Sequence, residues 1–140
     1  MQIEDEATNE AFAIGPIEPT TVIDSVKVSN LKLTKILTTR NHYDHPNCIM
    51  DLVKLLSDQK ILVYGSYEGI PGLTNKVVPN ETFRIGSQNV KCLFLPNNTT
   101  DHMCYHVSNK DAWSCVFTGA DTKKILRENR ERLPSGTMLF

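Results

Sequence analysis

Several features that mark particular classes of protein are missing from this sequence of 140 residues. No apolar run approaches the ~20 residues that a membrane-spanning helix needs. The net charge is −1, so the chain lacks the basic field that favours nucleic acid. No signal peptide is seen, and the cysteines form no C-x-x-C pair, so we expect reduced thiols. These absences favour a cytoplasmic protein that binds neither nucleic acid nor a membrane.

The composition is that of one soluble domain. Hydrophobic residues make up 40% of the chain and charged residues 22%, which are ordinary values for a globular protein. A chain of this length can bury one modest core. No internal repeat, low-complexity segment or linker divides it. We therefore expect a single domain over residues 1–140.

Two segments have the spacing of amphipathic helices. In the first, Val22 and Val26 share one face, and Thr20 or Thr21 is the expected N-cap. The second begins near Pro46, where proline is tolerated in the first turn. A third helix, rich in charge, is expected over 123–133. The apolar face of the second helix follows the i, i+3, i+4, i+7 spacing and consists of Ile49, Leu52, Val53 and Leu56.

Short apolar and β-branched runs predict strands around these helices, which gives an α/β fold. The strands before and after the second helix form a β-α-β unit with parallel pairing. Residues 81–96 predict a hairpin that turns at 86–89, whereas the polar residues 1–9 are expected to fray. The other expected strands cover residues 11–15, 32–39, 60–65, 102–107, 113–119 and 137–140.

A polar cluster follows the strand expected at 32–39. His42, Asp44 and His45 lie within four positions, and their side chains are ligands that zinc or iron accepts. Two other strand exits are also polar, with the sequences PNNTTDH and TGADT. Since reactive groups of α/β proteins gather in loops at the carboxyl ends of strands, three loops could converge on one site. The alternative is a loop whose polar side chains bond to backbone groups.

The order of these segments resembles glyoxalase II, the hydroxyacylglutathione hydrolases. TTRNHYDH at 38–45 is similar to the T-H-x-H-x-D-H segment of metallo-β-lactamase-fold hydrolases. VYGSYEGIPGLTNKV, FRIGSQNVKCLFLPNNTTDHMCYHVS and VFTGADT resemble successive glyoxalase II segments, and RLPSGTMLF resembles the stretch before the G-H-E-Y of that family. The resemblance implies a metallo-β-lactamase-like αββα sandwich, incomplete because the family's first strands and C-terminal helical domain are missing. It also implies metal-dependent hydrolysis of S-2-hydroxyacylglutathione thioesters.

The metal site that the resemblance implies is incomplete. The family holds two metal ions with five histidines and two aspartates, and His42, Asp44 and His45 match members of that set. Arg40 stands at the first histidine of the motif, and Asn98 stands at a later one. The chain also has no counterpart of the G-H-E-Y histidine. Two bound ions are therefore not expected.

At most one zinc or iron ion is expected, or none. Asp121 lies one position beyond Ala120, which replaces the bridging aspartate of the family, so its carboxylate reaches the site only if its loop shifts. Catalytic zinc normally has three protein ligands and an open position. Asp44, His45 and Asp121 supply that number, whereas His42 stands alone on the other side of the site. Asp44 is also the residue expected to act in catalysis.

Three functions compete. The first is a weakly active hydrolase of small-molecule glutathione thioesters. The second is a non-catalytic pseudoenzyme that acts as a protein-interaction or binding module. The third is a fragment without a stable function. Arg40 discriminates between the first two, because the enzyme needs a ligand there. His102 matches a family position that orients the neighbouring loop. An exposed sheet edge would favour a homodimer, and a monomer in light scattering would count against it.

We hypothesise that Arg40 replaces the missing metal. A guanidinium stays protonated and only donates, so it cannot coordinate a cation. At about 5 Å its charge would repel a cation by about 3 kcal/mol at an effective dielectric near 20, and it would instead pair with Asp44 or Asp121. Elemental analysis of the purified protein is expected to find less than one zinc or iron ion per chain. A stoichiometric metal would contradict this hypothesis.

Overall fold

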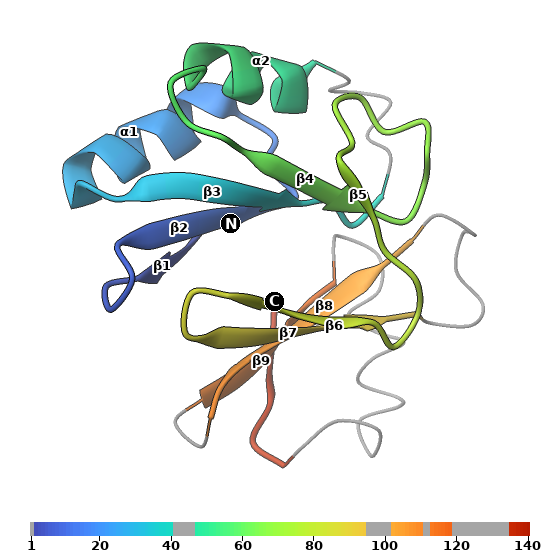
Figure 1. Cartoon of the computed structure of the whole chain (residues 1–140). Coiled ribbons are helices and arrows are strands. Elements are labelled where there is room, and N and C mark those ends of the chain that lie inside the picture. Colours follow the sequence, from blue (N-terminus) through green and yellow to red (C-terminus); the bar gives the residue numbers. More distant parts are fainter. Residues whose placement is uncertain (1, 41–46, 95–101, 111–112, 119–134) are drawn as a thin grey trace.

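Two five-stranded sheets face each other, and two helices cover the outer face of the first sheet (Figure 1). The computed structural model describes residues 2–40, 47–94, 102–110, 113–118 and 135–140. The first sheet contains, in spatial order, β1 (Gln2–Asp5), β2 (Glu10–Ile14), β3 (Lys32–Leu37), β4 (Leu62–Gly65) and β5 (Asn75–Lys76). The second contains β10 (Met138–Leu139), β9 (Trp113–Phe117), β8 (Cys104–Asn109), β7 (Gln88–Leu93) and β6 (Thr82–Ile85).

The described residues supply three layers of the expected αββα sandwich. The helices are α1 (Pro19–Ser29) and α2 (Cys48–Leu55). Strands β2, β3, β4 and β5 are parallel to one another, so the expected β-α-β unit of β3, α2 and β4 is confirmed. The charged helix expected over 123–133 lies outside the described residues.

The expectation that residues 1–9 fray is wrong. Residues 2–5 form β1, which pairs antiparallel with β2 and places Asp5 opposite Glu10. Ile3 packs against the core between the two sheets, and Asn9 has a positive φ of 60° next to the start of β2. The polar composition concealed this strand, because an outer strand buries few side chains and needs little apolar periodicity.

The first helix begins earlier than expected. Its apolar face is buried, as the spacing predicted, but the N-cap is Glu18 and not Thr20 or Thr21. Pro19 occupies the first helical position, where its fixed φ suits the helix and its missing N–H costs nothing. In α2, Leu52 is fully buried, while Pro46, expected in the first turn, lies outside the described residues.

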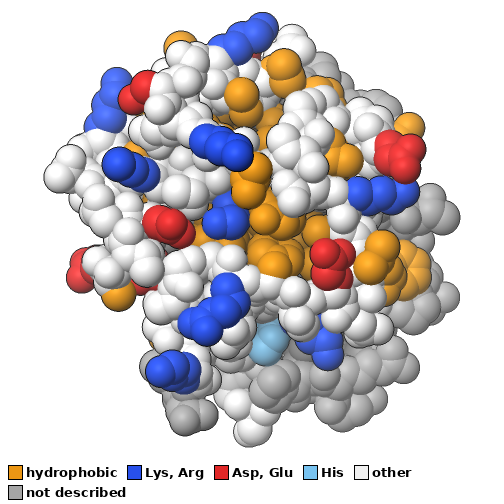
Figure 2. Space-filling model, in the orientation of Figure 1, with side chains coloured by type: hydrophobic (Ala, Val, Ile, Leu, Met, Phe, Trp, Pro, Cys, Tyr) orange, Lys and Arg blue, Asp and Glu red, His pale blue; other side chains and the backbone are white. Residues whose placement is uncertain are grey.

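Strand β2 serves two cores at once, because successive side chains of a strand point to opposite faces. Ala11 and Ala13 belong to the core beneath the helices. Phe12 and Ile14 belong to the core between the sheets. Burial of a large apolar side chain stabilises a fold by about 1.5–3 kcal/mol. Figure 2 shows hydrophobic side chains at the centre of one face of the molecule, with lysine, arginine and acidic side chains around them.

The second sheet follows the sequence pattern closely. The expected hairpin is β6 and β7, but its turn is shorter than expected and has only Gly86 and Ser87 between the strands. The expected strand at 137–140 is confirmed as β10, which runs parallel to β9. Its pairing is extended by bonds from the Phe140 N–H to the Val116 oxygen, at 2.8 Å, and from the Thr118 N–H to the Phe140 oxygen, at 3.0 Å.

A buried carboxylate joins the two sheets at the end where the β1–β2 and β6–β7 turns lie. The Asp5 carboxylate accepts hydrogen bonds from the Ser87 N–H at 2.6 Å, the Ser87 hydroxyl at 2.8 Å and the Ala7 N–H at 3.1 Å. Burial opposes ionisation of Asp5, but these bonds and one from Thr8 outweigh it and lower its pKa. Gly86 has φ 57°, and a Cβ there would collide with the Asp5 carboxylate, so a glycine is required.

Replacing Asp5 with asparagine is expected to destabilise the protein by about 1–3 kcal/mol, because the donors of Ser87 lose a charged acceptor. A lowered folded pKa stabilises the protein above the ordinary pKa of about 4, and this contribution is lost as the pH falls through the folded pKa. The deficit of Asp5→Asn should therefore be full at pH 7 and should shrink at acid pH. Urea unfolding of Asp5→Asn and the wild type, at pH 7 and at acid pH, measures this deficit in stability.

The exposed Glu6→Gln variant is the control and should unfold like the wild type at pH 7. Equal stability of Asp5→Asn and the wild type at pH 7 would show that the carboxylate does not join the sheets.

Candidate functional site

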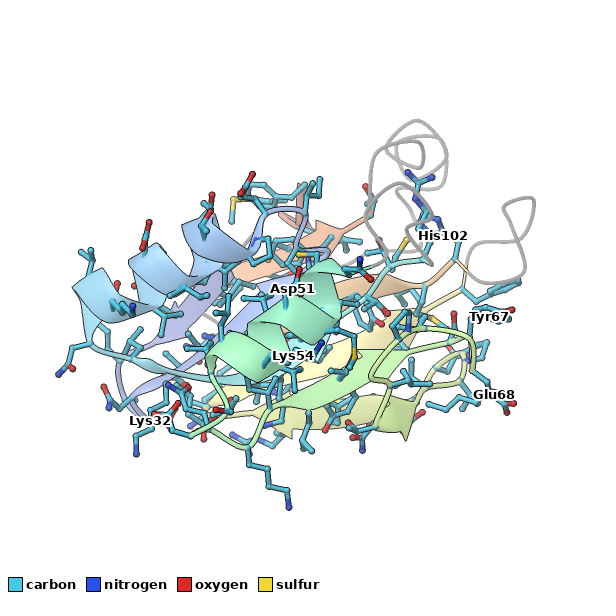
Figure 3. All side chains as sticks on the ribbon, turned by 90° about the horizontal axis from the view of Figure 1, so that it is seen from above. Lys32, Asp51, Lys54, Tyr67, Glu68 and His102 are labelled. Atoms are coloured by element: carbon cyan, nitrogen blue, oxygen red, sulfur yellow. The ribbon has the colours of Figure 1, made fainter. Side chains whose placement is uncertain are left out.

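The residues just before segments 41–46 and 119–134 and the residues just after segment 95–101 meet at one end of the sandwich. At this end β3 and β9 finish and β8 begins, and Figure 3 shows His102 there, away from the end that carries Lys32. The Met103 N–H donates to the Thr39 oxygen at 2.8 Å, and His102 bonds to the Thr118 oxygen at 2.6 Å. The strand exits that were expected to converge therefore start from adjacent positions. We call Thr38, Thr39, His102, Met103, Tyr105 and Thr118 the rim frame.

A buried tyrosine joins the rim frame across the sandwich. The Tyr105 hydroxyl donates to the Thr38 oxygen at 2.6 Å. Burial raises the pKa of Tyr105 well above its usual value, with a smaller effect of Cys92 and Cys104, so the phenol stays neutral and can donate. Thr38 also donates its N–H and its hydroxyl to the Tyr64 oxygen, both at 2.9 Å. The backbone that leads into the TTRNHYDH motif is thus held by both sheets.

His102 is buried just before β8 of the second sheet. Its ring is 3% exposed, and its Nε2 lies 2.6 Å from the Thr118 oxygen. Because a carbonyl oxygen only accepts, Nε2 must carry the proton. This bond links the residue after segment 95–101 to the residue before segment 119–134. The loop-orienting role that the resemblance implied for His102 stays a prediction.

Most of the predicted site residues lie outside the described residues. These are His42, Asp44, His45, Asn98 and Asp121, and their mutual geometry stays a prediction. Arg40 is described, and it is half-buried just beyond Thr39. Within the described ranges, no group of three or more histidine, cysteine, aspartate or glutamate side chains is placed to hold a metal ion.

The other potentially reactive side chains among the described residues are those of the cysteines and His106, and their environments fit a structural role. All four cysteines are buried and free, and burial raises the pKa of Cys115 to about 11 and, with Glu81, that of Cys92 to about 12. Such thiols remain protonated and are poor nucleophiles. Burial, and to a lesser extent Lys91, lowers the pKa of His106, whose Nε2 lies 2.9 Å from the Ser114 hydroxyl.

Sequence reasoning missed the hydroxyl groups of the rim frame. Thr38, Thr39 and Thr118 are each at most 3% exposed, and the β-branched shape of threonine reads as ordinary strand composition. Tyr105 gave a weak signal, since a tyrosine within an apolar strand needs a partner for its hydroxyl when it is buried. The partner belongs to the other sheet, 67 positions away.

Among the described helices, none has the length and apolarity to span a bilayer.

Curated proteins of known name are similar to most of this chain. A hydroxyacylglutathione hydrolase-like protein of Gallus gallus is 36% identical over 101 residues, covering 72% of this chain and 35% of the relative. Hydroxyacylglutathione hydrolase of Dictyostelium discoideum is 36% identical, with 82% and 44% covered. The cytoplasmic hydroxyacylglutathione hydrolase of Arabidopsis thaliana is 32% identical, with 84% and 46% covered. The chain thus spans about a third to a half of the length of these relatives.

Solved structures share the fold. ETHE1 from Myxococcus xanthus superposes with a TM-score of 0.66 and 27% identity, covering 84% of this chain and 49% of that chain. A metallo-β-lactamase from Staphylococcus aureus also gives 0.66, with 22% identity and coverage of 84% and 38%. No family model matches the sequence. The rim frame between two sheets and these structural matches define a protein of the metallo-β-lactamase fold.

Within that fold, the chain is a glyoxalase II-like protein, as the similarity to the hydroxyacylglutathione hydrolases shows. With 32–36% identity to these relatives, it is a divergent one.

Removing the Tyr105 hydroxyl with Tyr105→Phe is expected to cost about 1–3 kcal/mol of unfolding free energy, because the buried Thr38 oxygen loses a donor. The measurement is urea unfolding followed by circular dichroism. Tyr64→Phe is a matched control, since that ring stacks on Phe83 at 4.5 Å and should continue to do so. Equal effects of both substitutions would mean that the hydroxyl of Tyr105 does not hold the rim frame together.

Proposed function

We propose that this chain carries a glyoxalase II-type site that binds a glutathione thioester and hydrolyses it weakly, with at most one zinc or iron ion. One observation carries the proposal: hydrogen bonds of Tyr105, Met103 and His102 hold the rim frame together, and Arg40 stands next to it where the family has a ligand. The substrate class is taken from the names of the relatives, which are hydroxyacylglutathione hydrolases. A cytoplasmic location is part of the same proposal.

The ligands of the single ion would be Asp44, His45 and Asp121, with His42 close by, and Asp44 would also act in catalysis. Hydrolysis of a thioester places negative charge on the carbonyl oxygen as water attacks. A guanidinium fixed near that oxygen favours such charge electrostatically. In this proposal Arg40 lies near that oxygen and supplies part of the positive charge that a second ion would bring, although without activating a water molecule.

A pseudoenzyme is the second candidate, and Arg40 is the observation that favours it. Its charge lowers cation affinity, and Asn98 offers only an amide oxygen in place of an imidazole. A site of this kind would bind the glutathione thioester or a protein partner without turnover. The rim frame does not depend on metal ligands, so either function is compatible with the same fold.

The combined substitution Arg40→His and Asn98→His is expected to raise both metal content and hydrolysis of S-lactoylglutathione, because it restores two imidazoles of the family pattern. Metal is measured by elemental analysis after loading with zinc, and turnover by loss of the thioester. The increase should exceed tenfold in rate if one ion becomes tightly held, since a bound metal lowers a water pKa towards about 7.

Arg84→His, at an exposed position in β6, is the control and should change neither quantity. If the double variant gains no metal and neither protein binds the thioester, the proposed function is wrong. Thioester binding without turnover in the wild type would select the pseudoenzyme.

A further inference from the structure

A groove lies between the C-terminal ends of α1 and α2, which run side by side over the first sheet (Figure 1). Its volume is about 370 Å³, within the range of roughly 300–1,000 Å³ that is typical of small-molecule sites. The groove is close to the start of β3, and Figure 3 shows Lys32 at that end of the molecule, away from His102. All residues that line the groove belong to the described ranges, and none is part of the rim frame.

The floor of the groove is apolar. Val26, Leu31 and Leu56 line it, and all three are buried in the core beneath the helices. We call these three residues the apolar floor. Leu55 lines the same groove but is 62% exposed, although burial stabilises a large apolar side chain. A ligand with an apolar chain would cover Leu55 and the apolar floor together.

Two charged side chains of opposite sign also line the groove. Lys27 lies in the last turn of α1, and Asp58 follows the C-cap of α2. Both side chains are exposed, and within the described ranges neither forms an ion pair with the other or with a third residue. Since each can make charge-assisted hydrogen bonds, the pair can bind the two opposite charges of a single ligand.

The surroundings of Asp58 favour an ammonium group. Both helices end at the groove, and the carbonyl groups of a last helical turn carry partial negative charge. Gln59 also lines the groove, and its Oε1 is buried without a hydrogen-bond partner among the described residues. A buried acceptor without a donor is unfavourable. A turn of this amide into the groove would place Oε1 beside an ammonium group, which donates.

We propose that the groove binds a free α-amino acid with an apolar side chain. Lys27 binds the carboxylate, Asp58 and Gln59 accept hydrogen bonds from the ammonium group, and the ligand side chain packs on Leu55 and the apolar floor. A zwitterion matches both charges that line the groove, whereas a fatty acid or a simple amine matches only one. The site uses no residue of the rim frame, so it does not depend on the proposed function.

The test measures binding of leucine to the full chain by isothermal titration calorimetry at pH 7. Leucine is expected to bind saturably, and glycine, which lacks the apolar side chain, should bind at least about tenfold more weakly. Leucinamide lacks the carboxylate, and N-acetylleucine lacks the ammonium group. Each should bind about fivefold more weakly than leucine, as expected for one lost ion pair in a groove open to solvent.

Two substitutions assign the charges. Lys27→Gln should weaken leucine binding about fivefold and leave leucinamide unchanged, because that ligand has no carboxylate. Asp58→Asn should weaken leucine binding by a similar factor and leave N-acetylleucine unchanged. Lys54→Gln and Asp24→Asn are the matched controls, since each removes the same charge from an exposed helical position outside the groove. Both controls should bind leucine like the wild type.

Several results would overturn the proposal. Leucine binding that does not saturate, or that is the same in all four variants, would show that the groove is not the site. Leucinamide binding as tight as that of leucine would mean that the groove takes a cation, and equally tight N-acetylleucine would mean that it takes an apolar anion. These ligand comparisons on the wild type decide the proposal even where a variant loses its fold in circular dichroism.

Discussion

Two hydrogen bonds to the backbone just beyond β3 connect the sheets where the candidate site lies. The Thr38 and Thr39 oxygens have left the strand ladder of the first sheet, and they accept from Tyr105 and Met103 of the second. A buried carbonyl without a donor costs about 1–3 kcal/mol, so the loss of either bond would destabilise the contact between the two sheets at this end. The same two hydrogen bonds therefore join the two sheets and fix the backbone that leads into the TTRNHYDH motif.

That constraint uses none of the metal ligands of the family. Threonine carbonyls, a tyrosine hydroxyl and the imidazole of His102 hold the strand exits together. Ligand positions can therefore change, as we propose for Arg40, while the fold stays the same. The fold and the chemical site that it carries have separate physical requirements. In this chain, the residues that hold the two sheets together lie within a few positions of the motif but are not part of its ligand set.

The local sequence pattern predicted those helices and strands in which buried residues recur at a regular spacing along the chain. The apolar face of α2, the parallel pairing of β3 with β4, and the β6–β7 hairpin all have a period or turn that the sequence displays. It did not predict β1 or the two residues of β5, because these outer strands exist through pairing with neighbours. The role of Tyr105 was not readable from the sequence, because it depends on a partner in the other sheet, and the replacement of a ligand by Arg40 stays a prediction. The arrangement of His42, Asp44, His45 and Asp121 stays a prediction.

The contact of Asp5 with Ser87 has a consequence for the order in which the molecule assembles. These residues are 82 positions apart, and closing so long a loop costs entropy that local contacts do not repay. The carboxylate must stay hydrated until the β6–β7 turn exists to receive it. We therefore expect β1, which carries Asp5, to dock late in folding and to detach early in partial unfolding, at the end of the sandwich opposite the candidate site.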